Sequence, residues 1–307
     1  MQQETLLNMP IIGVVASSFY KPTSSGRGLL GTTNGPTNSQ VEYLLISTAG
    51  NSVNFGTLYN NRNGGQMCGS NTRVLYGGGT ATNYIDYFTT ATTGNASNFG
   101  SLSVARSATA SGGSITRGIW GGGNPSGGGF TDSIEYVTIA TTGNGTTFGT
   151  LTVSRSQVGG AGSPTRLVFF GGENGGGRLS TIDYVTIATT GNATSFGSML
   201  QLGSDLYSAM SSNTRAVHQA GYSNQSTMGY VTIASTGDSV SFGSYTSARY
   251  ACFGMSNSVT GIIGGGTSGT TMNAITIATT GNATGAGSQA GSSLCVGAGS
   301  DCHGGIA

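Results

Sequence analysis

Charged side chains are scarce in this sequence. They make up 7% of the 307 residues, lysine occurs once, and the formal net charge is +1. Proteins that bind nucleic acid or an anionic membrane surface usually carry a concentrated basic patch. The composition therefore predicts no nucleic-acid partner and no electrostatic attachment to a membrane.

Helix-forming segments and long hydrophobic runs are also lacking. No apolar run follows helical spacing, and none approaches the ~20 residues that cross a bilayer. The first residues, MQQETLLNMPIIGVV, have no basic start and are interrupted by Asn8 and Pro10. We therefore expect no secretory signal, no membrane insertion and an all-β fold. Glycine is abundant at 56 residues, but the 36% of hydrophobic residues recur in register, which is not typical of disorder.

One phrase dominates what is present. YVTIATTGN begins at Tyr136 and again at Tyr184, and looser copies begin at Tyr43, Tyr87, Tyr230 and Ala274. The copies are 44 to 49 residues apart. Twelve residues after each of the first five origins stands a phenylalanine followed by glycine: Phe55, Phe99, Phe148, Phe196 and Phe242; the sixth copy has Ala286 before Gly287. An arginine follows that glycine by six residues in four copies, with Gly203 and Ser293 as the exceptions.

Each repeat is interpreted as four short strands. In the third copy these are residues 117–122, 134–140 and 148–155, followed by the glycine- and serine-rich stretch before the next Thr-Arg. Periods in the forties with several strands per unit are typical of propeller blades, which bury their faces against one another. We predict a single propeller over residues 26–307, preceded by an extension at residues 1–25. Six blades are favoured, with seven as the alternative because both termini carry extra repeat-like residues. Residues 293–307 are expected to close the ring on the first blade.

A family resemblance rests on these motifs. The apolar strand ending in Gly-Gly, followed by an acidic residue and tyrosine, is similar to kelch-type propellers, although the kelch tryptophan is missing and the phenylalanine takes its place. YVTIATTGN followed by Phe-Gly, with the tail CHGGIA, resembles kelch-like proteins of marine tailed bacteriophages, cyanophages in particular. The resemblance covers residues 26–307. It implies a virion structural protein, located in the tail or another exposed part of the particle and assembled in the host cytoplasm.

The acidic residues are interpreted as part of the scaffold. Paired carboxylates are the usual mark of a glycosidase, but Glu42, Asp86, Glu135 and Asp183 all stand immediately before the repeat tyrosine. A catalytic group is needed once, whereas a scaffold residue recurs. The recurring arginines of the neighbouring strand are the expected ion-pair partners: Arg73, Arg117, Arg166 and Arg215. Asp132 and Glu173 lie outside the pattern and are the only isolated acidic candidates in the blade loops.

The sequence predicts no catalytic, cofactor-binding or metal-binding residue. Kelch-like galactose oxidases hold copper with two His and Tyr ligands, but this chain has only His218 and His303, and His218 replaces a packed strand residue. No phosphate-binding Gly-Lys-Ser/Thr motif occurs. The four cysteines fit no zinc spacing: Cys68, Cys252, Cys295 and Cys302. We expect free thiols, while a Cys295–Cys302 disulfide across a hairpin stays open.

Two functions are therefore expected as alternatives. One is a non-enzymatic structural or decorating virion subunit with other virion proteins as partners. The other is a lectin-like propeller that recognises host-cell glycans. Variable loops would carry the binding in either case, namely residues 60–71, 124–133, 173–181 and 222–229. Because they contain only Phe130 and Tyr222 as aromatic platforms for sugars, the structural role is favoured.

Overall fold

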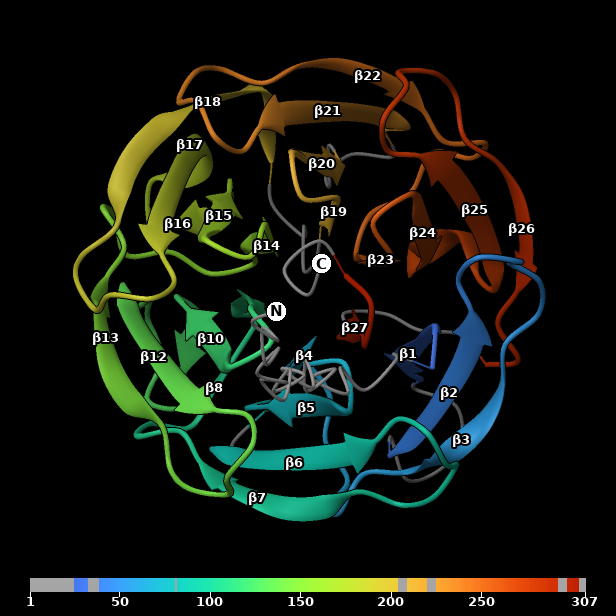
Figure 1. Ribbon diagram of the computed structural model, residues 1–307. Coiled ribbons are helices and arrows are strands. Elements are labelled where there is room, and N and C mark those ends of the chain that lie inside the picture. The colour runs from blue at the N-terminus through green and yellow to red at the C-terminus, as the bar shows by residue number, and fades with distance from the viewer. Residues whose placement is uncertain are drawn as a thin grey trace, which may run out of the picture.

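The chain forms a ring of six antiparallel sheets around a central axis, as shown by a computed structural model (Figure 1). The structure describes residues 25–32, 39–80, 82–203, 209–219, 225–291 and 297–303. Apart from one 3₁₀ turn at Gly266–Ser268, the regular elements of these residues are strands. The predicted six-bladed, all-β propeller is confirmed.

The blades follow one another in sequence, and the strands of each sheet succeed one another from the axis outwards. The first contains β27 (Ala298–Ser300), β1 (Arg27–Gly31), β2 (Gln40–Leu45) and β3 (Val53–Thr57). The second contains β4 (Gln66–Gly69), β5 (Arg73–Gly77), β6 (Tyr84–Thr89) and β7 (Ser97–Ser101). The third contains β9 (Ala110–Gly113), β10 (Arg117–Gly121), β12 (Ser133–Thr138) and β13 (Thr146–Thr150). Beside the third sheet, β8 (Arg106–Ser107) pairs with β11 (Asn124–Pro125).

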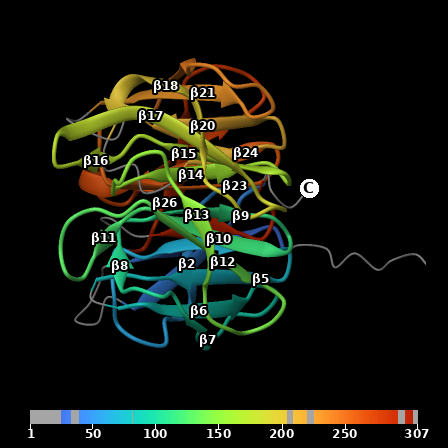
Figure 2. The same ribbon diagram turned by 90° about the vertical axis from the view of Figure 1, so that its left-hand side faces the viewer.

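The other three blades keep the same order. The fourth contains β14 (Gly159–Gly162), β15 (Arg166–Phe170), β17 (Gly177–Thr186) and β18 (Thr194–Gly203), with β16 (Glu173–Asn174) paired to β17. The fifth contains β19 (Met210–Ser211), β20 (Arg215–Gln219), β21 (Thr227–Thr232) and β22 (Val240–Ser244). The sixth contains β23 (Cys252–Ser256), β24 (Thr260–Gly265), β25 (Thr271–Thr276) and β26 (Thr284–Ser288). The loops at β11 and β16 project from one side of the ring (Figure 2).

Three details of the predicted strands and loops are corrected. The glycine-rich fourth strand of each repeat joins the next sheet, where it is the innermost strand; β14, for example, pairs with β15. The strand expected at residues 148–155 begins at Thr146 and ends at Thr150, because Leu151 to Arg155 leave the sheet to cross to the next blade. Residues 60–71, expected as a variable loop, include the inner strand β4.

The carboxy-terminal segment closes the ring. Its strand β27 pairs with β1 in the register Leu29 opposite Gly299, so the first blade is built from both ends of the chain. The Asp301 carboxylate accepts hydrogen bonds from the backbone nitrogens of Ser25, at 2.6 Å, and Arg27, at 3.1 Å. This is the closure predicted from the repeat-like tail.

The repeated phrase joins each blade to the one before it. In the third blade, the side chain of Asn144 accepts a hydrogen bond from the Ser101 nitrogen at 3.0 Å, and the Gly143 nitrogen donates to the Phe99 carbonyl at 2.9 Å. The equivalent side chains that accept at the other five junctions are Asn51, Asn95, Asn192, Asp238 and Asn282. The Thr-Gly-Asn turn therefore binds the outer strand of its neighbour, which covers an edge that would otherwise promote aggregation.

The glycine after each repeat phenylalanine is required by the same junction. A β-carbon on Gly149 would stand far inside van der Waals contact with the carbonyl oxygen of Gly191 in the next blade. The same holds at the other five junctions, where the equivalent glycines are Gly56, Gly100, Gly197, Gly243 and Gly287. Phe-Gly and Thr-Gly-Asn are thus the two halves of one interblade contact.

Aromatic and arginine side chains anchor each blade internally. The rings of Tyr136 and Phe148 meet edge to face with centroids 5.9 Å apart, and the Arg117 guanidinium lies 4.5 Å above the tyrosine centroid. Four other blades repeat this stack. The phenylalanine is buried among aliphatic residues of two adjacent blades, so it has the anchoring position expected for it.

Candidate functional site

The acidic residue before the repeat tyrosine forms a buried ion pair between blades. The pairs are Arg62–Asp86 at 2.9 Å, Arg106–Glu135 at 2.7 Å and Arg155–Asp183 at 2.9 Å, with every partner at most 2% exposed. The arginine is the one six residues after the repeat glycine, and it comes from the segment that crosses into the blade of the acid. The carboxylates thus have a partner in the scaffold and no access to solvent.

The prediction of which arginines pair with the acidic residues was wrong. Arg73, Arg117, Arg166 and Arg215 stack on the repeat tyrosines and donate to backbone carbonyls of the following blade. Arg166, for example, donates to the Ile233 carbonyl at 3.0 Å and the Ala234 carbonyl at 2.8 Å. Sequence spacing did not separate the two arginine sets because both recur once per blade; only the strand geometry decides which one reaches the carboxylate.

Burial also shifts the pKa values of the groups in these pairs. Loss of solvent raises the pKa of Asp86, an effect that the adjacent Arg62 opposes. Burial likewise lowers the pKa of Arg106 and of Arg155, each against the opposing effect of its carboxylate. A carboxyl group with a raised pKa is often catalytic, but here the cause is desolvation inside an interblade junction. The pKa shifts therefore follow from burial within the scaffold.

Two junctions use variants of this arrangement. At the sixth blade, Arg249 donates to the side-chain oxygen of Asn273 at 3.1 Å, so an amide replaces the carboxylate. At the first blade the sequence has Ser293 in place of the junction arginine, and Glu42 accepts from the backbone nitrogens of Ala290 and Gly291 at 3.0 and 3.1 Å, and from the Ser52 hydroxyl. In both cases the acceptor oxygen is satisfied by the protein itself.

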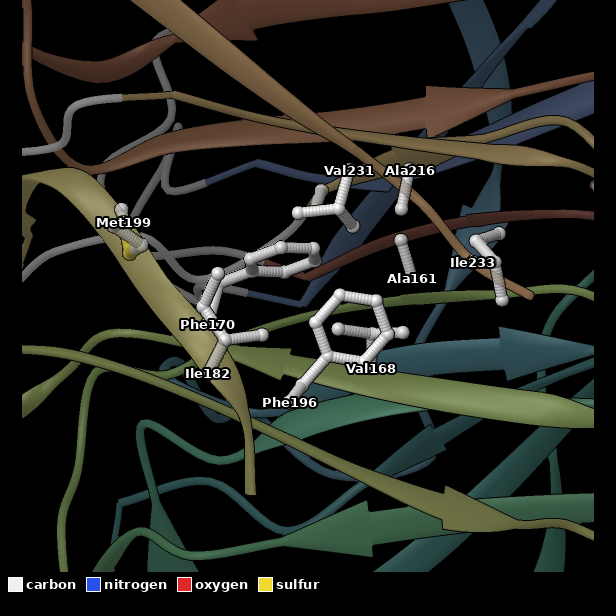
Figure 3. Close-up of a cluster of buried hydrophobic side chains, with 10 residues drawn as sticks. Ala161, Val168, Phe170, Ile182, Phe196, Met199, Ala216, Val231 and Ile233 are labelled. Carbon is white, nitrogen blue, oxygen red and sulfur yellow. The ribbon is translucent and has the colours of Figure 1, made fainter. Parts of the chain in front are cut away.

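The junction between the fourth and fifth blades lacks both partners. Gly203 stands where the arginine would be, and Gly229 stands where the acid would be. Phe170 and His218 occupy part of the vacated volume, with ring centroids 5.1 Å apart and planes inclined by 32°. Phe170 belongs to an apolar cluster with Phe196, Met199 and Val231 (Figure 3). This aromatic contact stands where the junction of the third and fourth blades has the ion pair Arg155–Asp183.

The replacement does not fill the space. A cavity of about 280 Å³ lies beside it, and its described lining residues come from β18 and from β20 to β22: Leu200, Gln201, His218, Thr227, Met228, Gly229 and Ser241. This cavity was not predicted from the sequence. The signal was present, because Gly203 and Gly229 are exceptions at two positions that form a pair in other blades.

The two histidines lie in different parts of the ring. His218 is buried in β20 opposite Gly229, as expected for a packed strand residue, and burial lowers its pKa to about 4. His303 lies near the axis, where its Nε2 atom is 2.8 Å from the Gly69 carbonyl. Among the residues that the structure describes, no three His, Cys, Asp or Glu side chains gather closely enough to hold a metal ion.

A small cavity lies among the inner strands. Its volume is about 40 Å³, and its lining consists mainly of small residues of the six inner strands, together with Met67, Met255 and His303. Serine hydroxyls link neighbouring strands across it: Ser211 donates to the Gly162 carbonyl at 2.8 Å, Ser256 to Ser211 at 3.0 Å and Ser300 to Ser256 at 2.6 Å. This polar lining holds the strands together and leaves little room for a ligand.

Cys68 and Cys302 are not activated thiols. Burial raises the pKa of Cys68 and, with the nearby Asp301 carboxylate, raises the pKa of Cys302 to about 12. Both of these thiols are free. Cys295 lies outside the described residues, as do residues 222–224 of one predicted binding loop.

The remaining candidates are peripheral. Asp132 is partly buried in a blade loop. Glu173 is partly buried in strand β16 and accepts from the Gln157 side chain at 2.7 Å. The described part of the chain contains no helical segment with the length and hydrophobicity of a membrane span.

A scan against protein-family models and a search of curated proteins both find no match to this chain.

Proposed function

We propose that this protein is a non-enzymatic structural or decorating subunit of a tailed-phage virion, located in the tail or on another exposed part of the particle. The repeat phrase and the closing tail support this assignment through their resemblance to kelch-like phage proteins. Its partners are other virion proteins, which the ring contacts through its variable loops and its amino-terminal extension, residues 1–25.

One observation carries the non-enzymatic part of the proposal. The recurring carboxylates, which are the best catalytic candidates by composition, are buried in junctions between blades, as in the pair Arg155–Asp183. A glycosidase needs two carboxyl groups open to its substrate on either side of the scissile bond. The ring uses the same groups to hold its blades together.

A second candidate function has one observation in its favour. The cavity at the junction of the fourth and fifth blades is polar at several points and accessible from the outer strands β18 and β22. A propeller that binds host-cell glycans would need such a site. This receptor-binding role is compatible with an exposed position on the particle, so the two candidates differ in ligand rather than in location.

The test is the position of the protein on particles. Gold-labelled antibodies against the propeller, applied to intact virions, are expected to label one defined part, and mass spectrometry of the purified particles is expected to detect the chain. If purified virions contain none of it, the virion assignment is wrong. Hydrolysis of a glycan by the pure protein, abolished by Asp183→Asn, would contradict the non-enzymatic assignment.

A further inference from the structure

An asparagine followed by glycine occurs at four positions of the chain: Asn34, Asn63, Asn144 and Asn174. Asparagine is a chemically labile residue, and it is most reactive before glycine, whose backbone nitrogen is not shielded by a side chain. Asn34 lies outside the described residues. The fold holds the other three asparagines in different ways, and we use that difference to infer which of them reacts.

Asn174 stands at the turn between β16 and β17, in a loop that projects from one side of the ring (Figure 2). Gly175 and Gly176 form the exposed tip of this turn. The Asn174 Oδ1 atom accepts from the Gly176 nitrogen at 2.9 Å, a contact within the turn itself. Among the described residues the Gly175 nitrogen has no hydrogen-bond partner, and a β-carbon at Gly175 would meet no atom within 4 Å. The tip therefore deforms without breaking a contact to another blade.

Asn144 has the same neighbour in sequence but a different environment. It belongs to the repeat turn that binds the preceding blade. Its Oδ1 atom accepts from the Ser101 nitrogen at 3.0 Å, and the Gly145 nitrogen donates to the Ser101 carbonyl at 2.8 Å. The side-chain amide and the backbone nitrogen that would attack it are thus both bound to one residue of the second blade. Both hydrogen bonds must break before these groups can react.

Asn63 is also restrained. Its Oδ1 atom accepts from the Thr80 hydroxyl at 2.7 Å, and its carbonyl oxygen accepts from the Thr80 nitrogen at 2.8 Å. Gly64 is buried, which limits the access of water to this pair. Asn174 is therefore the least restrained of the three Asn-Gly pairs that the structure describes.

We propose that Asn174 is a site of spontaneous deamidation, at which the turn between β16 and β17 gains a negative charge as the protein ages. Hydroxide removes the proton of the Gly175 nitrogen, and this nitrogen attacks Cγ of Asn174. A bond forms between the two atoms, the bond from Cγ to Nδ2 breaks, and Nδ2 leaves as ammonia after taking a proton from water. Water then adds to one carbonyl carbon of the resulting succinimide ring and opens it to aspartate or isoaspartate.

The reaction alters one of the loops expected to bind partners, residues 173–181. Because Asn174 follows Glu173, two carboxylates become neighbours, and the formal net charge of the chain falls from +1 to zero. Isoaspartate also lengthens the backbone within the turn, which disturbs the pairing of Asn174 with Gly177. The chemistry does not depend on the virion assignment. Mass spectrometry of the pure protein tests the reaction, whereas labelling of particles tests the assignment.

The test is a time course on the full chain. The folded protein is incubated in mildly alkaline buffer made with oxygen-18 water, transferred to ordinary water, and digested with trypsin. Heavy oxygen then marks only the residues that reacted during the incubation. Tryptic cleavage places Asn174 in the peptide 167–178 and Asn144 in the peptide 118–155. We expect heavy oxygen at Asn174 and at least about tenfold less at Asn144, as for a reaction that first requires two hydrogen bonds to break.

Two controls separate the effect of the fold from that of the sequence. In guanidinium chloride the chain is unfolded, and Asn144 and Asn174 should then react at similar rates, because each precedes a glycine. In the folded protein, Gly175→Ala should remove most of the incorporation at Asn174, because the added methyl group hinders the attacking nitrogen. This variant should fold normally, since the new β-carbon meets no atom and Gly175 does not have the left-handed φ that favours glycine.

Two outcomes would overturn the proposal. If the unfolded chain incorporates heavy oxygen at Asn174 and the folded protein does not, the turn protects this residue. Equal incorporation at Asn144 and Asn174 in the folded protein would mean that the hydrogen bonds to Ser101 do not decide which asparagine reacts.

Discussion

Gly149 lacks a side chain where the carbonyl oxygen of Gly191, in the next blade, occupies the position that a β-carbon would need. This contact repeats around the ring and joins the phenylalanine-glycine motif to the Thr-Gly-Asn turn. It explains why both motifs recur with so little variation.

The first prediction concerns this contact. Gly149→Ala should lower the free energy of unfolding by about 3 kcal/mol, because backbone atoms of the neighbouring blade must move to admit the methyl group. Gly143→Ala is the matched control, since a β-carbon at residue 143 meets no atom within 4 Å. Urea denaturation of both variants measures the difference. Equal stabilities would mean that the junction yields without cost.

The second prediction concerns the buried ion pairs. Arg155→Leu should destabilise the ring by about 3–5 kcal/mol, because Asp183 is left buried without its partner. Arg155→Leu combined with Asp183→Leu should recover a large part of that loss, because the junction of the fourth and fifth blades packs without either partner. The comparison is made by urea denaturation at neutral pH. If the double variant were as unstable as Arg155→Leu alone, the loss would not come from the unpaired carboxylate of Asp183, and the prediction would be wrong.

The third prediction concerns the core. Phe148→Ala and Phe196→Ala should each cost about 3–5 kcal/mol, the usual range for a large aromatic removed from a packed interior. Both rings are 3% exposed. Val104→Ala, at a side chain that is 50% exposed, is the control and should change little. Thermal and urea denaturation measure the loss of stability in each variant. A loss below about 1 kcal/mol for Phe148→Ala would contradict its anchoring role.

The fourth prediction concerns ring closure. Deleting residues 293–307 removes β27 and the Asp301 contacts, which exposes the edge of β1. We expect aggregation or a much lower melting temperature, monitored by light scattering and calorimetry. Deleting residues 1–10, which match no blade strand in sequence, should leave the fold intact. A monomeric carboxy-terminal truncation with unchanged melting temperature would contradict this closure.

The fifth prediction concerns pH. Burial lowers the pKa of His218 from 6.5 to about 4. Between these two pH values the ring is therefore neutral in the folded protein and protonated in the unfolded chain. Its stabilising contribution is therefore present above pH 6.5 and is lost as the pH falls through 4. The loss amounts to about 3 kcal/mol at about 1.4 kcal/mol per pKa unit.

The measurement compares stability curves between neutral and acidic pH. His218→Phe should lose less stability than the unmodified protein over this interval, because it has no proton to gain at that position. His303, whose pKa is also lowered by burial, contributes equally to both proteins. Parallel curves would show that His218 does not titrate below its ordinary pKa.

Several features of the fold were predictable because they repeat. The register of Tyr136, Phe148 and Gly149 appears in nearly every copy, and a period in the forties leaves few architectures other than a propeller. The tail at residues 293–307 resembles the strands of internal blades in sequence, so its pairing with the first blade followed from the need to cover an open edge. Local spacing is sufficient for such inferences.

The pairing of side chains across blades was not predictable from spacing. Arg106 and Arg117 both recur once per blade, yet only Arg106 reaches Glu135, while Arg117 lies on the Tyr136 ring. The difference depends on the direction in which the chain crosses from one sheet to the next. The cavity beside His218 has the same origin, because it exists only where two exceptions far apart in sequence, Gly203 and Gly229, meet at one junction. The repeat by itself determined the blades and favoured six of them over seven, whereas the packing of the blades against one another decided the number and decided which polar side chains are buried in pairs.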